Sequence, residues 1–254
     1  NIIQSKNFYW NTNFNIAFNK NKVTALYEQT SAQNGMFYLK EGYNYYTFYL
    51  KEFAGVDPNN GDPLYYTDAT HSATTNKIAE ATYNITNKQA NPKYTGGFSN
   101  NFNYKGINLG VDFNFSMGNY VYGASDIYFT SGAYYTYNKY LYIYEHRWTT
   151  PGQVTDVPKF SPKTDNSTST YRLYKGDFIR LRNVSLGYDL ANLKSSMLQK
   201  YGINKLNLYV RATNFATFLF DDRLPFDPEV SYSGFESNDM PKYKTITFGI
   251  NVGF

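Results

Sequence analysis

Apolar and polar side chains alternate with a period of two along several long stretches of this chain. The clearest stretches are 8–18, 107–117, 205–220 and 245–254. In the last of them the apolar positions are Ile246, Phe248, Ile250, Val252 and Phe254. Thr, Gly and Asn occupy the positions between them. A period of two places successive side chains on opposite faces, so each stretch is predicted to be a β-strand with one apolar face.

Two further stretches show where strands are expected to turn or bend. The stretch 94–104 is joined to the strand 107–117 by residues 105–106 alone, which predicts a hairpin with a short turn. In 177–190 the apolar positions change parity near residues 182–183. This change predicts either a β-bulge or two zones of the strand in different surroundings.

The stretch 43–54 has strand-forming residues but no clean phase, because Tyr and Phe fall on both faces. It is typical of the aromatic girdle of a barrel, and equally of a strand buried on both sides. With it, about seven strands are predicted. Long irregular connections are predicted over 55–92, 118–175 and 221–240. Long loops at one end and short turns at the other are typical of bacterial outer-membrane β-barrels.

Composition also favours a membrane barrel. Aromatic residues make up 20% of the chain, with 28 Tyr and 20 Phe, although the mean hydropathy is −0.56. A soluble domain of that polarity rarely carries so many rings, whereas a barrel needs them at its two interfaces. No apolar run approaches the ~18 residues of a membrane helix, so a helical membrane protein is excluded. The predicted fold class is therefore an all-β, antiparallel transmembrane β-barrel, with a soluble sugar-binding β-sandwich as the alternative.

No catalytic, metal or cofactor-binding residues are predicted, and the protein is not expected to be an enzyme. The chain has no Cys, and its two histidines, His71 and His146, lack metal-ligand spacing. Asp227 and Glu229 could form a carboxylate pair, but nothing near them in the sequence supplies a partner. The net charge of +4 comes from dispersed Lys and Arg, so nucleic acid is not a predicted partner.

Seven runs of sequence, in a consistent order, carry a resemblance to a known family. Those towards the C-terminus are GDFIRLRNVSLGYDL (176–190), GINKLNLYVRATNFATF (202–218), DPEV (227–230) and TITFGINVGF (245–254). Those towards the N-terminus are KNFYWNTNFNIAFNKNKVTAL (6–26), AGVDPNNGDPLYY (54–66) and NPKYTGGFSNNFNYKGINLGVDFNFSMGN (91–119). Together they resemble the C-terminal barrel portion of a SusC-type (SusC/RagA family) TonB-dependent outer-membrane transporter. The resemblance covers nearly the whole chain.

The resemblance implies a barrel of about 22 strands around an N-terminal plug. Residues 1–254 would be the C-terminal part of that single barrel domain, without the plug and the N-terminal barrel strands. The implied function is TonB-dependent import of a bulky nutrient, an oligosaccharide or a peptide, across the cell outer membrane. The implied partners are a SusD-type surface lipoprotein, TonB acting through the absent N-terminal region, and outer-membrane lipid. A non-transporting barrel scaffold in a surface complex would carry the same motifs.

The resemblance also implies roles for two groups of residues. In such barrels the terminal aromatic residue and its same-face neighbours form the assembly signal, which here would be Phe248, Ile250, Val252 and Phe254. Rings in the connection 118–175 could contact the ligand or the lipoprotein, because aromatic rings stack on sugars. These candidates are Tyr134, Tyr135, Tyr137, Tyr142, Tyr144 and Trp148. The alternative is that these rings pack the connection against itself.

The expected orientation follows if Phe254 lies at the periplasmic end. The three long connections are then extracellular, and the turns at 105–106 and 190–203 are periplasmic. Polar side chains on the inward face are expected to line the lumen. They include Asn108, Asp112, Asn114 and Arg211.

Overall fold

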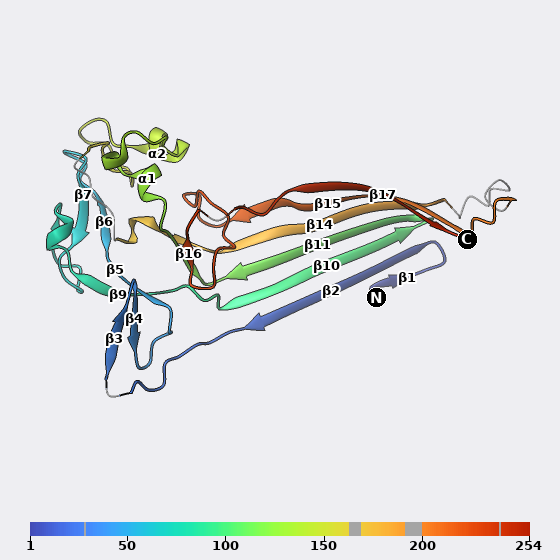
Figure 1. Cartoon of the computed structure of the whole chain (residues 1–254), viewed down its shortest axis with the longest axis horizontal. Helices are drawn as coiled ribbons and strands as arrows, with labels where there is room; N and C mark the ends of the chain where they lie inside the picture. Colours follow the sequence, from blue (N-terminus) through green and yellow to red (C-terminus); the bar gives the residue numbers. More distant parts are fainter. Residues whose placement is uncertain (28, 163–168, 191–199, 239) are drawn as a thin grey trace.

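The computed structural model describes residues 1–27, 29–162, 169–190, 200–238 and 240–254. Its largest element is an antiparallel sheet with the strand order β1-β2-β10-β11-β14-β15-β17 (Figure 1). These strands are β1 (Ile3–Gln4), β2 (Phe8–Phe18), β10 (Tyr94–Tyr104), β11 (Ile107–Met117), β14 (Phe178–Asp189), β15 (Lys205–Leu219) and β17 (Thr245–Gly253). Within the described residues β1 and β17 are the two edges of this sheet, so it is an open section of barrel wall.

The pairing register places the alternating apolar side chains of the long strands on one face. One row across five strands consists of Phe14, Phe98, Phe113, Leu181 and Ala216. This face is uncovered, with Phe14 58% and Phe248 80% exposed. An apolar surface of this extent is what a barrel presents to lipid. The predicted strand phases are confirmed.

The opposite face carries small and polar side chains that contact one another. Asn103 donates a hydrogen bond to Asn108. Gly249 makes room for the ring of Tyr209, because a Cβ at this position would lie 2.3 Å from the ring. The residues predicted to face inward all lie on this face; they are Asn108, Asp112, Asn114 and Arg211.

The predicted hairpin and bulge are both present. Lys105 and Gly106 have φ values of 48° and 90° between β10 and β11. Two successive left-handed residues make a type I′ turn, whose twist matches that of the flanking strands. In β14, Leu181 and Asn183 have pairing partners on both sides, but Arg182 between them has none. The change of parity is therefore a β-bulge.

The stretch 43–54 is not a strand of the large sheet, and counting it there was wrong. It forms β5 (Thr47–Lys51) and β6 (Phe53–Val56), which belong to two smaller sheets. Phe48 and Leu50 are fully buried on one face of β5, and Tyr49 packs against other tyrosines on the opposite face. Packing on both faces explains the missing phase. The seventh strand of the large sheet is the short β1.

The long connections contain more regular structure than the sequence predicted. Before and within 55–92 lie β3 (Ser31–Asn34), β4 (Phe37–Lys40), β7 (Pro63–Tyr66), β8 (Thr74–Thr75), the 3₁₀ helix η1 (Ile78–Glu80) and β9 (Tyr83–Gln89). Within 118–175 lie β12 (Tyr120–Gly123), α1 (Ile127–Thr130), η2 (Gly132–Tyr134), α2 (Leu141–His146), η3 (Thr170–Arg172) and β13 (Leu173–Lys175). The third connection contributes β16 (Phe235–Glu236). No helix among the described residues is long and apolar enough to cross a membrane.

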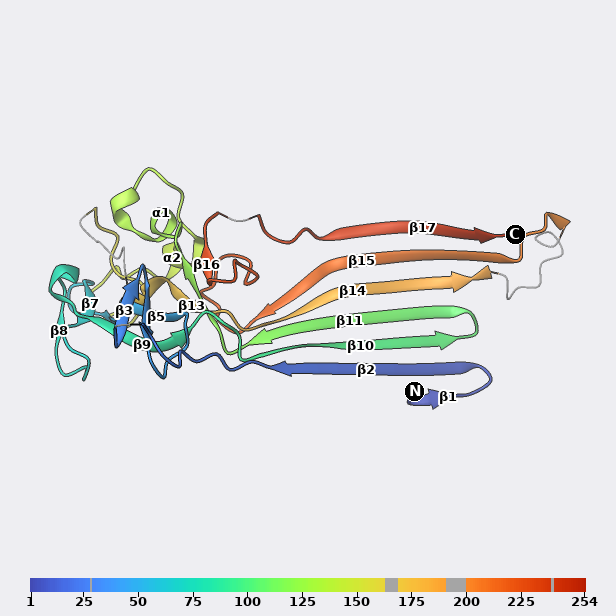
Figure 2. The ribbon, with the colours of Figure 1, turned by 60° about the horizontal axis from the view of Figure 1, so that its bottom comes forward.

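These connections gather at one end of the large sheet, in what we call the loop lobe (the described residues of 19–93, 118–177 and 220–244; Figure 2). Its apolar core draws on all three connections and consists of Phe37, Phe48, Leu50, Ala90, Tyr122 and Leu173, with Phe235 packed against it. The turn at 105–106 and the C-terminus lie at the other end of the sheet (Figure 2). The predicted asymmetry of long and short connections is thus confirmed. Most of the predicted turn 190–203, namely 191–199, lies outside the described residues.

Candidate functional site

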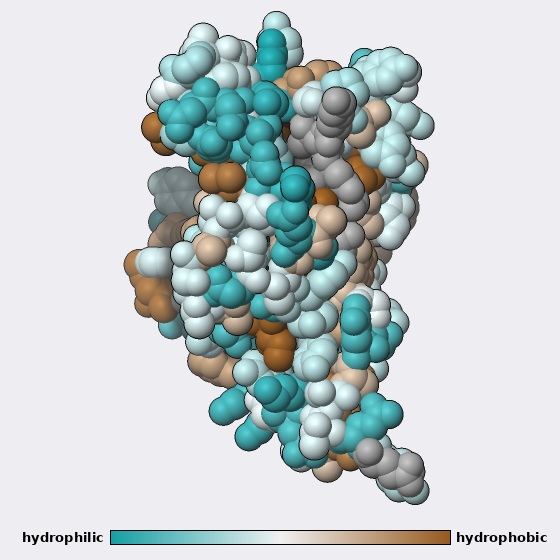
Figure 3. Space-filling view, turned by 90° about the vertical axis from the view of Figure 1, so that its left-hand side faces the viewer, coloured by the Kyte–Doolittle hydropathy of each residue, from teal (hydrophilic) through white to brown (hydrophobic). Residues whose placement is uncertain are grey.

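The loop lobe is the part of the chain that can meet a water-soluble ligand. Viewed from the lobe end, most of its surface is hydrophilic, and hydrophobic residues form small separate patches (Figure 3). This contrasts with the uncovered apolar face of the large sheet. The change of surface along the long axis separates a lipid-contacting region from a region in water.

The first predicted contact residues, Tyr134, Tyr135 and Tyr137, lie after α1. Tyr134 packs edge-on against Tyr128 with ring centroids 4.8 Å apart, and Tyr137 lies 5.1 Å from the same ring. Lys139 donates hydrogen bonds to the carbonyl oxygens of Tyr128 and Tyr134, at 2.7 and 2.6 Å. Tyr135 does not join this cluster and is 70% exposed. Two of these three rings therefore pack the connection against itself.

The second group, Tyr142, Tyr144 and Trp148, lies on and after α2. The Tyr142 hydroxyl donates to Asp156 at 3.0 Å, and burial together with this bond raises the pKa of Tyr142 to about 12. Trp148 lies over Gly61, and its Nε1 donates to the carbonyl of residue 58 at 3.1 Å. Tyr144 is 64% exposed. The six predicted residues therefore do not form one site. Tyr135 and Tyr144 are the most exposed of them, and the Arg147 guanidinium lies over the Tyr144 ring, 4.3 Å from its centroid.

A different set of tyrosines lines a pocket that the sequence did not reveal. On the face of β4, β5 and β9 away from the lobe core, Tyr49 lies between Tyr38 and Tyr83, with ring centroids 4.6 and 5.4 Å away. His71 Nε2 and Glu52 Oε2 form a hydrogen bond of 2.7 Å beside these rings. The pocket has a volume of about 430 Å³, within the range of small-ligand sites. The sequence held no local signal for this pocket, because its three rings, Tyr38, Tyr49 and Tyr83, come from three different strands.

This aromatic pocket combines the two properties that sugar and peptide ligands require. Ring edges and faces give apolar contact. The Asn84 amide donates a hydrogen bond to Glu52 Oε2 at 3.3 Å, which leaves its second N–H and Glu52 Oε1 as donor and acceptor for a ligand. Lys40 also lines the pocket and supplies a positive charge. Aromatic contact with a few convergent polar groups is typical of a binding site.

A charged network ties the third connection to the inward face of the large sheet. Arg180 on β14 is 1% exposed and pairs with Asp227 at 2.6 Å and with Glu229 at 3.0 Å. Arg182, the bulged residue, also pairs with Glu229 and donates to Asn214 at 3.0 Å. The carboxylates noticed in the sequence therefore have arginine partners. Sequence alone missed them because the partners lie 47 residues away.

The electrostatics of Asp227 follow from these contacts. Burial raises its pKa, whereas hydrogen bonds from Arg180 and from the backbone N–H groups of Glu229 and Lys242 lower it. The net pKa of Asp227 lies below its ordinary value, because the bonds to the charged form prevail. The carboxylate therefore stays charged at neutral pH and holds the DPEV run on the barrel wall.

The two histidines have local contacts. His71 is hydrogen-bonded to Glu52 and stacks on Tyr66, and His146 Nδ1 donates a hydrogen bond to the Tyr142 carbonyl while its ring stacks on that of Tyr142. In the described part of the chain, no three His, Asp or Glu side chains lie close enough together to hold a metal ion.

Comparison with known proteins places these features in context. No family model matches the chain. A TonB-dependent receptor of Formosa agariphila is 28% identical over 288 residues, covering 99% of this chain and 27% of the receptor. The TonB-dependent receptor SusC of Bacteroides thetaiotaomicron is 24% identical over 273 residues, covering 99% of this chain and 25% of that protein. The chain thus spans about a quarter of the length of these relatives.

Solved structures give the same relationship. The structure of the RagAB peptide transporter superposes with a TM-score of 0.81 and 27% identity, covering 100% of this chain and 28% of that chain. The RagAB peptide importer in the open-open state gives a TM-score of 0.79 and 29% identity over 100% of this chain and 27% of that chain.

Proposed function

Because this chain is a homologue of SusC-type TonB-dependent receptors, which are β-barrels of the outer membrane, we propose that it forms part of a barrel that imports a bulky nutrient. The observation that carries the proposal is the match over the full chain to such receptors, both in sequence and in fold. The uncovered apolar face and the inward polar face support it, since both are needed for a lumen that crosses lipid.

We infer that the chain supplies the C-terminal part of the barrel and that the loop lobe lies outside the cell. The terminal strand β17 then ends at the periplasmic side, opposite the lobe. A surface lipoprotein of the SusD type would cover the lobe, and TonB would act on a plug inside the barrel. The hydrophilic surface of the lobe suits contact with such a lipoprotein and with ligand.

The nutrient is an oligosaccharide or a peptide. RagAB is described as a peptide transporter, which favours a peptide, and the pocket around Tyr49 suits either ligand. The exposed rings of Tyr135 and Tyr144 are further contact candidates. The remaining rings of the predicted set, Tyr134, Tyr137, Tyr142 and Trp148, would support the lobe from within.

Uptake by cells that carry the full-length receptor tests this function. Cells are offered a labelled oligosaccharide mixture or a labelled peptide mixture, with and without the receptor gene and with and without TonB. Uptake of one class should disappear when either gene is removed and should return on complementation. Unchanged uptake, together with loss of a surface complex, would instead support a barrel scaffold.

Tyr49→Ala tests the pocket separately. Tyr49 is the central ring of the pocket, and an aromatic contact with a bound ligand contributes ~0.5–1.5 kcal/mol, so we expect the receptor's affinity for its nutrient to fall by about two- to tenfold. Tyr27→Ala is the matched control, because Tyr27 is 88% exposed in the same lobe. Equal affinities for the two variants would exclude the pocket as a contact site.

A further inference from the structure

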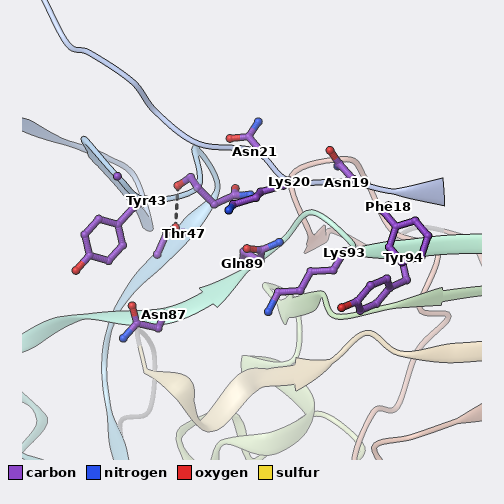
Figure 4. Close-up of a pocket in the computed structure, with 12 residues that line it drawn as sticks. Phe18, Asn19, Lys20, Asn21, Tyr43, Thr47, Asn87, Gln89, Lys93 and Tyr94 are labelled. Atoms are coloured by element: carbon purple, nitrogen blue, oxygen red, sulfur yellow. Dashed lines mark hydrogen bonds between the residues drawn. The ribbon is translucent and has the colours of Figure 1, made fainter.

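A second pocket lies where the loop lobe meets the outer end of the large sheet. It has a volume of about 550 Å³ and is formed by the ends of β2 and β10, the segment after β2, and residues of the lobe. In Figure 4, Phe18 and Tyr94 lie on one side of this pocket, Tyr43 and Thr47 on the other, and Gln89 and Lys93 between them. We call it the rim pocket.

The rim pocket continues the lipid-facing surface. Phe18 and Tyr94 are register partners at the lobe end of β2 and β10, with ring centroids 5.6 Å apart. They are 74% and 42% exposed and share the face of Phe14 and Phe98. At the other end of the same two strands, Phe8 and Tyr104 form a second register pair.

The spacing of these two ring pairs places the rim pocket at the membrane surface. Ten residue steps from Phe8 to Phe18 at ~3.4 Å each span about 34 Å along the strand. With a strand tilt of about 40°, this becomes about 26 Å along the membrane normal, which matches the ~25 Å apolar band of outer-membrane barrels. Phe18 and Tyr94 are then girdle residues of the outer leaflet, and the pocket just beyond them lies at head-group level.

The charge of the rim pocket is positive. Lys20 and Lys93 are its only charged lining residues, and no Asp or Glu is among the twelve residues that line it. Among the described residues, neither lysine takes part in an ion pair. Lys20 belongs to the Asn-Lys-Asn-Lys run (19–22), which follows β2 directly and is not part of the strand.

The wall of the pocket also holds an unused donor. Asn44 is 7% exposed, and its Oδ1 accepts a hydrogen bond from the Tyr46 backbone N–H at 2.9 Å. Its Nδ2 has no hydrogen-bond partner among the described residues. This atom has less than 1 Å² of accessible surface, so it lies behind the wall of the pocket and does not meet a ligand. The other side-chain amides that line the pocket are those of Asn19, Asn21, Asn87 and Gln89, and an oxygen-rich ligand can accept hydrogen bonds from such groups.

We propose that the rim pocket binds the phosphorylated head group of an outer-leaflet glycolipid. Lys20 and Lys93 pair with the phosphate, and Phe18 and Tyr94 pack on the first methylenes of the acyl chains. The amides that line the pocket, Asn19, Asn21 and Gln89, bond to the sugar oxygens. Along the membrane normal the two lysines lie further from the membrane centre than the rings of Phe18 and Tyr94. The groups of such a lipid have the same order, with phosphate and sugar outside the hydrocarbon. The site lies on the outer surface of the barrel and is independent of the imported nutrient.

The test uses the full-length receptor, purified in detergent and reconstituted with defined lipid. Native mass spectrometry measures the occupancy of a phosphorylated lipid A and of the same lipid after removal of its phosphate. We expect the wild-type receptor to retain the phosphorylated form, and the Lys20→Gln/Lys93→Gln double variant to retain about thirtyfold less, since each of the two cations near a lipid surface contributes about 1 kcal/mol. Equal retention of the two lipids by the wild-type receptor would overturn the proposal.

Lys105→Gln is the matched control, because Lys105 lies over the Tyr104 ring at the opposite end of the same strands. It should bind the phosphorylated lipid as the wild type does. A loss equal to that of the double variant would show a general charge effect and would contradict a site at the rim pocket.

Inorganic phosphate added in large excess should leave the lipid bound; displacement of the lipid would show that the pocket takes free anions and would also overturn the assignment. The wild-type comparison of the two lipids stands even if the double variant folds poorly.

Discussion

Val111 lies in the middle of β11, on the uncovered apolar face, between Asn100 and Val184 of the neighbouring strands. We predict that Val111→Arg lowers the free energy of unfolding of the full-length barrel by ~2–4 kcal/mol, because an arginine at mid-depth must be taken into lipid. Urea titration in lipid vesicles measures this change. Asn101→Arg is the control, because Asn101 follows Asn100, the partner of Val111, but its side chain lies on the polar face. It should change the free energy of unfolding by less than about 1 kcal/mol. Equal effects would mean that the two faces have been assigned the wrong way round.

Asp227 determines how the third connection responds to acid. Its pKa is lowered in the folded protein, so its contribution to stability is present above the unfolded pKa near 4 and is lost as the pH falls through the folded value. We predict that the protection factors of the amides in residues 225–236, which are corrected for the intrinsic pH dependence of exchange, fall as the pH is taken below about 4. Asp227→Asn should lower the free energy of local opening of this segment by about 1–3 kcal/mol at neutral pH, because buried Arg180 loses a partner. Its amides should then exchange faster.

Asp222→Asn is the control for this network, since Asp222 is an exposed carboxylate of the same connection. It should leave exchange unchanged at neutral pH. If both variants behave alike, the ion pair with Arg180 does not hold the connection on the barrel wall.

At the scale of one element, β17 combines two properties. It is the strand edge of the described sheet, and its apolar residues are among the most exposed, with Phe248 80% and Phe254 85% exposed. This is compatible with the proposed assembly signal of Phe248, Ile250, Val252 and Phe254. A free row of backbone groups next to exposed rings is a surface on which another strand can pair.

We predict that removal of Phe254 reduces the amount of full-length receptor in the outer membrane severalfold, because the insertion machinery loses the terminal ring. Immunoblots of purified outer membranes provide the measurement. Phe254→Tyr keeps an aromatic ring and should restore normal levels. Normal levels of the deletion variant would exclude a signal that depends on the terminal residue.

At the scale of the whole molecule, the large sheet and the loop lobe are stabilised in different ways. The sheet depends on lipid against its apolar face, whereas the lobe has its own buried core in water. Residues from three connections meet in that core, so the lobe is one packed body and not a set of separate loops.

We predict that Phe48→Ala destabilises the lobe by ~3–5 kcal/mol, because Phe48 is fully buried in the lobe core. Limited proteolysis of intact cells should then cut the lobe faster, while the heat-modifiable gel mobility of the barrel stays unchanged. Tyr135→Ala, at a 70% exposed position, should do neither. A barrel that melts together with the lobe would show that the two parts fold as one unit.

The sequence alone determined the six long strands of the large sheet, the face that each presents, the hairpin at 105–106 and a change of parity near Arg182. These features depend on side chains one or two positions apart, and a period of two is visible in any single strand. The ordered runs also pointed to the family, and with it to the outer membrane, before any contact was known.

Only the tertiary structure decided the rest. It showed that 43–54 lies in the lobe and not in the barrel wall. It showed which of the predicted aromatic rings are packed and which are exposed, and that Asp227 pairs with Arg180. It also formed the pocket around Tyr49 and the rim pocket. Each of these depends on residues that are far apart in the chain and meet only when the connections pack. The local alternation of side chains does not predict these contacts, because their free energy comes from burial and pairing between residues distant in the sequence.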